Sequence, residues 1–236
     1  MPANKQIFQL DIPLDLDVDE ILKRLRFRGI NSRIEAMARE LAEAARAVAR
    51  PRAIYQVSRA RVIDSATVEV DGVRFTSRAL SRNLIGQATV YPFIATAGRE
   101  LDELPLPPGD MMRQYYLDLI KTVVLVRGVD YLADSIRERF SLGFVTHMNP
   151  GELEDWPITQ QRPLFSLFGG AERQIGVELK DSGVMKPIKS RSGIIFPSES
   201  RFVSCLLCTQ VKCPGRRAAY DAVMAAEWLG KTNSKL

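Results

Sequence analysis

The chain has 236 residues, 46% of them hydrophobic and 26% charged, and its formal net charge at pH 7 is +5. These values are typical of a globular protein with one or two buried cores, so extensive disorder is not expected. Lys and Arg are scattered and are not interleaved with aromatic residues, which argues against nucleic acid as a partner. No run approaches the roughly 18 apolar residues of a membrane span, and the start lacks the layout of a secretion signal. We therefore expect a cytoplasmic protein with no membrane partner.

The first half of the chain predicts short helices followed by hairpin strands. Asp17 is placed to cap a helix over 18–27, and a second helix begins after Asn31 and ends before Pro51. Asp71-Gly72 separates two strand-like runs and is typical of a type I′ hairpin. The remaining patterns predict strands at 52–58, 65–70, 73–77 and 88–96 and a short helix over 77–84.

In the second half, Asp110 is placed to cap the longest helix, over 111–139. Runs of strands joined by hairpins and separated by helices of varied length predict an α+β fold with a mainly antiparallel twisted sheet flanked by helices. The composition changes near Pro197, so we expect a main domain over 1–200 and a Cys-containing tail with a C-terminal helix over 201–236. The other expected elements are a strand at 142–148, a helix from Thr159, strands at 175–179 and 190–196, and a last helix over 215–229.

A tight turn at Asn149-Pro150-Gly151 is the first candidate site, because such a turn exposes backbone groups that hold small polar ligands. On its own the turn is more simply interpreted as a chain reversal. It is followed by "DWPITQQ" and "DSGVMKPIKSRSGIIF". In this order and spacing the segments resemble the activation domain of cobalamin-dependent methionine synthase, which binds S-adenosylmethionine. "LKRLRFRG", "ARPRAIYQV", "GVRFTSRALSRNL" and "FIATAGRELDEL" resemble stand-alone forms of that domain, so the resemblance covers most of residues 18–197.

The resemblance implies a single C-shaped domain and a ligand site. Asn149, Pro150, Gly151 and Glu152 would hold S-adenosylmethionine through backbone groups. Asp181-Ser182 matches the family's Thr-Glu-Ser segment. The family's Met-x-Pro and Ser-x-Ser-Gly segments are matched by Met185, Pro187, Ser190, Ser192 and Gly193, and the stretch from Met185 to Ser192 would line the side that faces cobalamin.

Two positions depart from the family pattern. The family's Arg falls at His147 and its Tyr falls near Glu152. His147 would offer one hydrogen bond to the ligand's carboxylate, or Arg139 or Arg191 would replace the missing guanidinium. His147 is also the only histidine, so it is the only residue around which a His-based catalytic system could be built.

A carboxylate on the long helix is expected to hold the ligand's α-amino group, as in the family. Asp130 is the best-placed match, and Asp134 follows one turn later. A carboxylate holds an ammonium by a charge-assisted hydrogen bond. The alternative is that both are solvated helix residues.

Three cysteines, Cys205, Cys208 and Cys213, form a C-x2-C-x4-C pattern with Arg216 and Arg217 behind it. An odd number of clustered cysteines is not a disulfide framework. Three thiolates could hold a four-iron four-sulfur cluster with one iron left open, or zinc with a fourth ligand from elsewhere. The alternative is a set of reduced, partly buried thiols. The resemblance does not extend to this tail.

The function that the resemblance implies is reductive reactivation of a cobalamin-dependent methyltransferase, most simply methionine synthase. The protein would be of methyltransferase type and would position the methyl group of S-adenosylmethionine over the cobalt of a partner's cobalamin. A corrinoid protein and a low-potential electron donor of flavodoxin or ferredoxin type would be its partners. No catalytic acid or base is required, so none is predicted. The alternatives are a redox or adaptor module whose Cys tail carries the metal, and a structural interaction protein.

Overall fold

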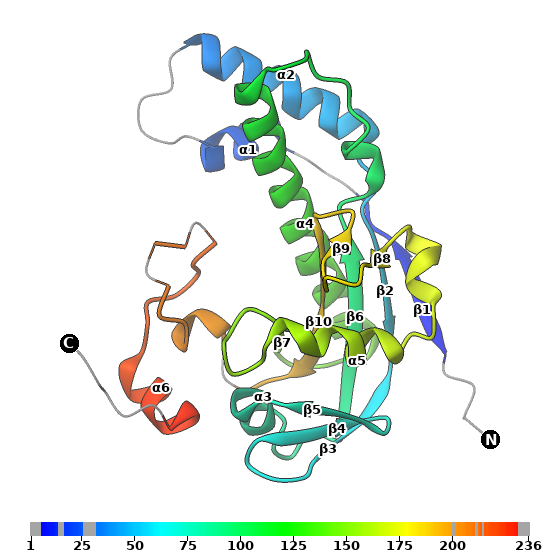
Figure 1. The fold of residues 1–236 in the computed structure, drawn as a ribbon, viewed down its shortest axis with the longest axis vertical. Coiled ribbons are helices and arrows are strands. Elements are labelled where there is room, and N and C mark those ends of the chain that lie inside the picture. Colours follow the sequence, from blue (N-terminus) through cyan, green and yellow to red (C-terminus); the bar gives the residue numbers. More distant parts are fainter. Residues whose placement is uncertain are drawn as a thin grey trace.

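The computed structural model describes residues 6–13, 17–25, 32–199, 202–210, 212–213 and 215–230. Its centre is an eight-stranded antiparallel sheet (Figure 1). β6 (Thr89–Thr96) lies in the middle, with β2 (Arg52–Gln56) and β3 (Ser58–Val62) along one side and β10 (Ser190–Pro197) along the other. Beyond them β1 (Ile7–Asp11) pairs with β2, β7 (Val145–Met148) with β10, and β3 with the hairpin of β4 (Thr67–Val70) and β5 (Val73–Thr76).

Helices cover one face of this sheet. α4 (Met111–Arg139) packs on it, α1 (Val18–Leu25) and α2 (Ser32–Val48) pack on α4 and on each other, and together they bury a first hydrophobic core. Figure 1 shows α1, α2 and the first half of α4 extending beyond the strands, so the molecule is elongated with a helical end.

Shorter elements cover the other face and bury a second core. Neighbouring residues of a strand point to opposite faces, so Ile194 lies in the second core and Ile195 in the first. This alternation decides which side chains of β10 can meet the turn after β7. The covering elements are α3 (Arg78–Asn83), η2 (Ile158–Gln160), α5 (Gln161–Ser166), η3 (Ala171–Ile175) and the small hairpin of β8 (Glu178–Leu179) and β9 (Met185–Lys186).

The fold class and several predicted boundaries are confirmed. Asp71 and Gly72 have φ values of 47° and 84°, as a type I′ turn requires. α4 occupies the predicted range, and its N-cap Asp110 accepts a hydrogen bond from the Arg113 N–H at 2.9 Å. Asp17 caps α1 through a 2.9 Å bond from the Asp19 N–H, whereas the expected last residues of that helix and the Asn31 cap lie outside the described residues.

Other boundaries were wrong. The last helix, α6 (Ala222–Leu229), begins seven residues later than expected, because Asp221 is its N-cap and accepts a bond from the Met224 N–H at 2.9 Å. A 3-10 helix, η3, occupies most of the segment before Gly176, so the strand expected from Ile175 is reduced to β8. β1 and β3 were not predicted.

The C-terminal tail packs against the second core. The Phe202 and Trp228 rings stack at 5.2 Å between centroids, and the Arg82 guanidinium lies 5.6 Å from the Trp228 ring. Arg78 Nη1 also donates to the Leu229 carbonyl at 2.8 Å. The domain boundary near residue 200 stays a prediction, but the tail and the sheet share apolar contacts.

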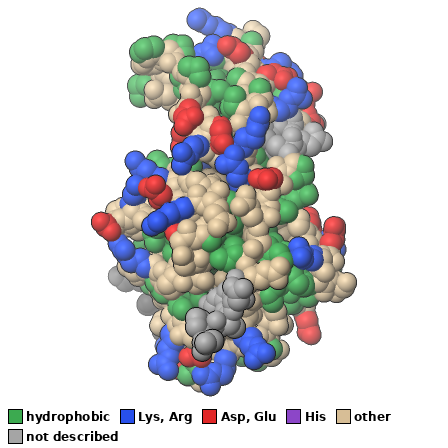
Figure 2. All heavy atoms as spheres, turned by 90° about the vertical axis from the view of Figure 1, so that its right-hand side faces the viewer, with side chains coloured by type: hydrophobic (Ala, Val, Ile, Leu, Met, Phe, Trp, Pro, Cys, Tyr) green, Lys and Arg blue, Asp and Glu red, His purple; other side chains and the backbone are tan. Residues whose placement is uncertain are grey.

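Figure 2 shows Lys and Arg side chains interspersed with Asp and Glu over the face that it presents. No helix among the described residues is long and apolar enough to cross a membrane.

Candidate functional site

The predicted turn follows β7 directly and is held by its own hydrogen bonds. Asn149 is buried, and its Nδ2 donates to Glu152 Oε1 at 2.6 Å and lies 3.3 Å from His147 Nδ1. Gly151 has a φ of 89°, and its N–H donates to the Trp156 carbonyl at 2.7 Å. The structure therefore brings His147, Asn149 and Glu152 into one connected group, in a turn that needs glycine at its third position.

His147 is neutral in this group. Its side chain is buried, and burial lowers the pKa of the imidazole to about 3, helped by the positive charges of Arg191 and Arg217. The hydrogen bond with Asn149 opposes this shift but does not cancel it. Because the imidazole of His147 is therefore uncharged at physiological pH, it cannot replace the missing guanidinium as a cation.

Two arginines supply positive charge near the turn instead. Arg191 lies on β10 two residues before Gly193 and four before Ile195, which pairs with His147, so all three β10 residues share one face. The charge of Arg217, in the tail, also acts on His147. The tail is bound to β7 by a hydrogen bond of 2.6 Å from Thr146 Oγ1 to the Phe202 carbonyl.

Arg139, the other proposed replacement, is placed elsewhere. Its guanidinium lies 4.3 Å from the Phe8 ring of β1, the edge strand opposite β7. Burial raises the pKa of Tyr55, and the nearby charge of Arg139 opposes this shift. Of the two proposed arginines, only Arg191 is close enough to His147 to shift its pKa.

Several buried polar atoms around the turn have no hydrogen-bond partner among the described residues. They are Asn149 Oδ1, Glu152 Oε2, Trp156 Nε1 and Ser192 Oγ. Native proteins pair nearly all such atoms, so these atoms are able to bind a polar group of a ligand or a water. Ser192 points to the opposite face of β10 from Gly193, so these atoms do not form one cluster.

The remaining predicted residues have varied surroundings. Ser190 Oγ is satisfied, since it donates to the Pro187 carbonyl at 2.7 Å and lies 3.0 Å from Thr96 Oγ1. Met185 is half-buried in β9 against the second core. Asp130 is exposed on α4, and its role in holding an ammonium group stays a prediction.

The segment after the turn has a structural role that the sequence reading missed. Asp155 accepts hydrogen bonds from Ser77 Oγ at 2.5 Å and from the Ala79 N–H at 2.9 Å, at the start of α3. The Gln160 amide pairs with both backbone groups of Thr76, at 2.6 and 2.7 Å. These bonds fix the turn to the β5–α3 corner. Spacing alone could not reveal them, because the partners are about 80 residues apart in sequence.

The cysteine pattern lies in the tail, and metal binding by Cys205, Cys208 and Cys213 stays a prediction. Among the described residues, which include all three cysteines, no group of three His, Cys, Asp or Glu side chains is arranged to hold a metal ion. A guanidinium organises the loop instead: Arg216 donates to the carbonyls of Cys205 and Cys208 at 3.2 and 2.7 Å. The same side chain donates to the carbonyls of Gln210 and Ala218, both at 2.9 Å.

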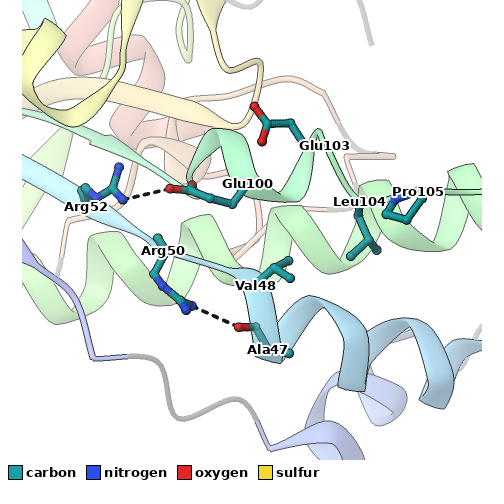
Figure 3. Close-up of a pocket in the computed structure, with 8 residues that line it drawn as sticks. All are labelled: Ala47, Val48, Arg50, Arg52, Glu100, Glu103, Leu104 and Pro105. Atoms are coloured by element: carbon teal, nitrogen blue, oxygen red, sulfur yellow. Dashed lines mark hydrogen bonds and ion pairs between the residues drawn. The ribbon is translucent and has the colours of Figure 1, made fainter.

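Two cavities of about 500 and 300 Å³ lie beside the end of α2, and neither is lined by a residue of the turn. Figure 3 shows the larger one, with Arg52 and Glu100 at one end of it and Leu104 and Pro105 at the other.

No family model matches the chain, and no curated protein sequence matches it. A solved structure, the crystal structure of the MetH reactivation domain bound to AdoHcy, is similar, with a TM-score of 0.56 and 16% sequence identity. The match covers 97% of this chain and 90% of that chain. It leaves out only 3% of the 236 residues, so it extends into the tail, for which no counterpart had been expected. The chain therefore has the α+β fold seen in that reactivation domain.

Proposed function

We propose that this protein binds S-adenosylmethionine at the turn after β7 and reactivates a cobalamin-dependent methyltransferase. The observation that carries the proposal is the fold, shared over nearly the whole chain with a reactivation domain whose structure holds AdoHcy. AdoHcy is what S-adenosylmethionine becomes when it gives up its methyl group. The connected group of His147, Asn149 and Glu152 gives the proposal its location.

The ligand's carboxylate is assigned to Arg191. A guanidinium binds a carboxylate with two parallel hydrogen bonds, which a neutral His147 cannot offer. Arg217 would add a second positive charge from the tail. The ammonium is assigned to the unpaired Oε2 of Glu152, with Asp130 as the acidic residue that the family resemblance implies.

Backbone groups from Asn149 to Gly151 would hold the rest of the ligand, and Met185, Ser190 and Ser192 belong to the segment assigned to the cobalamin-facing side. The chemistry is transfer of the sulfonium methyl group to cobalamin carried by a partner protein, coupled to one-electron reduction by a low-potential flavodoxin or ferredoxin. This chain contributes position, which accounts for much of the rate when two reactants must meet in line.

Calorimetric titration with S-adenosylmethionine tests the proposal. We expect saturable binding by the natural protein and binding at least about tenfold weaker in Arg191→Gln, because a charge-assisted pair is lost. Arg61→Gln is the matched control, since Arg61 is an exposed strand residue whose guanidinium pairs with Glu69. The absence of binding by the natural protein, or equal affinity in both variants, would overturn the assignment.

A further inference from the structure

The tail places two cysteines at the two ends of one tight turn. Cys205 and Cys208 belong to the segment between β10 and α6 (Figure 1), and the Cys208 N–H donates to the Cys205 carbonyl at 3.3 Å. Residues joined by a bond of this kind have Cα atoms less than about 7 Å apart, and a disulfide requires about 4.4–6.8 Å. The backbone therefore holds these two residues at a separation that a disulfide can span.

Packing and hydrogen bonds fix this turn on both sides. Leu206 and Leu207, the two residues between the cysteines, pack against the second core. The Leu206 carbonyl accepts a bond from the Asp221 N–H at 2.8 Å, and Arg216 donates to the carbonyls of both cysteines. Because the turn is anchored in this way, the two thiols are held near each other without the help of a partner.

The three cysteines have different surroundings. Cys205 is partly exposed, and its Sγ accepts a hydrogen bond from the Arg217 N–H at 3.3 Å. Such a bond stabilises negative charge on sulfur, which favours Cys205 as the attacking thiol. Cys208 is also partly exposed and packs against the second core. Cys213 is exposed in a turn of its own, where its carbonyl accepts a bond from the Arg216 N–H at 3.1 Å.

The segment that carries the pair is positively charged. Residues 202–217 include Lys212, Arg216 and Arg217 and contain no Asp or Glu. The next acidic residue, Asp221, is occupied as the N-cap of α6. A positive field raises the rate at which an anionic reactant meets the site. We propose that Cys205 and Cys208 form a redox-active dithiol, which is oxidised by low-molecular-weight disulfides that carry carboxylates, such as glutathione disulfide.

The reaction is thiol–disulfide exchange in two steps. The Cys205 sulfur attacks one sulfur of glutathione disulfide, whose S–S bond breaks and releases one glutathione. The Cys208 sulfur then attacks the Cys205 sulfur, so that the bond between Cys205 and Cys208 forms and the second glutathione leaves. The two cysteines lose two electrons and two protons, and the two glutathione molecules take them up.

Equilibration in glutathione buffers tests the pair. The full chain is reduced, incubated at rising ratios of glutathione disulfide to glutathione, alkylated and analysed by peptide mass spectrometry. We expect a Cys205–Cys208 disulfide and an alkylated Cys213. Cys213→Ser is the matched control and should move the midpoint ratio by less than about twofold. Cys208→Ser lacks the second thiol and should stop at a mixed disulfide between Cys205 and glutathione.

A bridge that contains Cys213, or no bridge at the most oxidising ratio, would overturn the proposal. Iron or zinc in the purified protein that protects Cys205 and Cys208 from alkylation would overturn it as well. Added sodium chloride should slow oxidation by glutathione disulfide but not by cystamine, a cationic disulfide. The same response to salt with both reagents would rule out the preference for an anionic disulfide. These measurements do not involve S-adenosylmethionine, so their outcome is independent of the proposed function.

Discussion

Asn149 Oδ1 occupies the space that a side chain on Gly193 would fill. A Cβ atom there would also lie 2.5 Å from the Met148 carbonyl and 2.9 Å from the Phe93 ring. Two of these three obstacles are a backbone group and a buried aromatic ring, which cannot move aside cheaply. The close approach of the turn to β10 therefore depends on glycine at position 193.

Gly193→Ala is expected to destabilise the protein by about 1–3 kcal/mol, because the methyl group overpacks the β7–β10 contact. Urea denaturation at neutral pH measures the loss. Gly143→Ala is the control, since a Cβ there meets nothing within 4 Å, and it should change the free energy of unfolding by less than about 0.5 kcal/mol. Similar stability of the two variants would contradict the close contact.

The buried His147 predicts acid sensitivity. Its pKa is about 3 in the folded protein against 6.5 in the unfolded chain, so the unfolded state binds more protons between these values. The stabilisation is full above pH 6.5 and is lost as the pH falls toward 3, by at most about 5 kcal/mol. Urea unfolding at pH 7.5 and 4.5 should show a smaller pH effect in His147→Gln than in the natural protein. Parallel losses in both would place the imidazole in solvent.

The hydrogen bonds of Arg216 are expected to limit the reactivity of Cys205 and Cys208. Without its guanidinium, the carbonyls of Cys205 and Cys208 lose their donor and the loop around them should open more often. Arg216→Ala should therefore speed labelling of these thiols by a disulfide reagent while changing overall stability little. Arg217→Ala removes the same charge without removing those bonds and serves as the control. Equal labelling rates would rule out the guanidinium as the organiser of the loop.

Asp155 is expected to stabilise the start of α3, although it lies about 80 residues away in the sequence. Asp155→Ala removes the acceptor for Ser77 Oγ and the Ala79 N–H and should cost about 0.5–2 kcal/mol of unfolding free energy. Asp134→Ala removes an exposed carboxylate paired with Arg137 at 3.3 Å and should cost almost nothing. Chemical denaturation compares the two directly.

Elements with strong local signals could be predicted from the sequence. The hairpin at Asp71-Gly72 and the helix capped by Asp110 depend on residues next to each other in the chain, so their positions were correct. β3 was missed because it is short, carries Arg59 and Arg61, and gains its structure from pairing with β4 and β6. The strand conformation of β3 therefore depends on its pairing with other strands, as is usual for short polar strands.

The site was predictable in part for a related reason. The turn residues are neighbours in sequence, and they do lie together. Which face of β10 meets them could not be predicted, because both faces of that strand are buried and its sequence has no polar–apolar alternation. Whether Ser192 or Gly193 faces the turn therefore became clear only with the strand register.

The stacking of Phe202 on Trp228 has a practical consequence for dissecting this protein. A fragment that stopped at residue 200 would expose the patch on which Phe202, Leu207 and Leu229 now pack. Uncovered apolar surface of this kind promotes self-association. Truncation is therefore expected to yield aggregates, so the roles of the cysteines are better separated by point substitution than by shortening the chain.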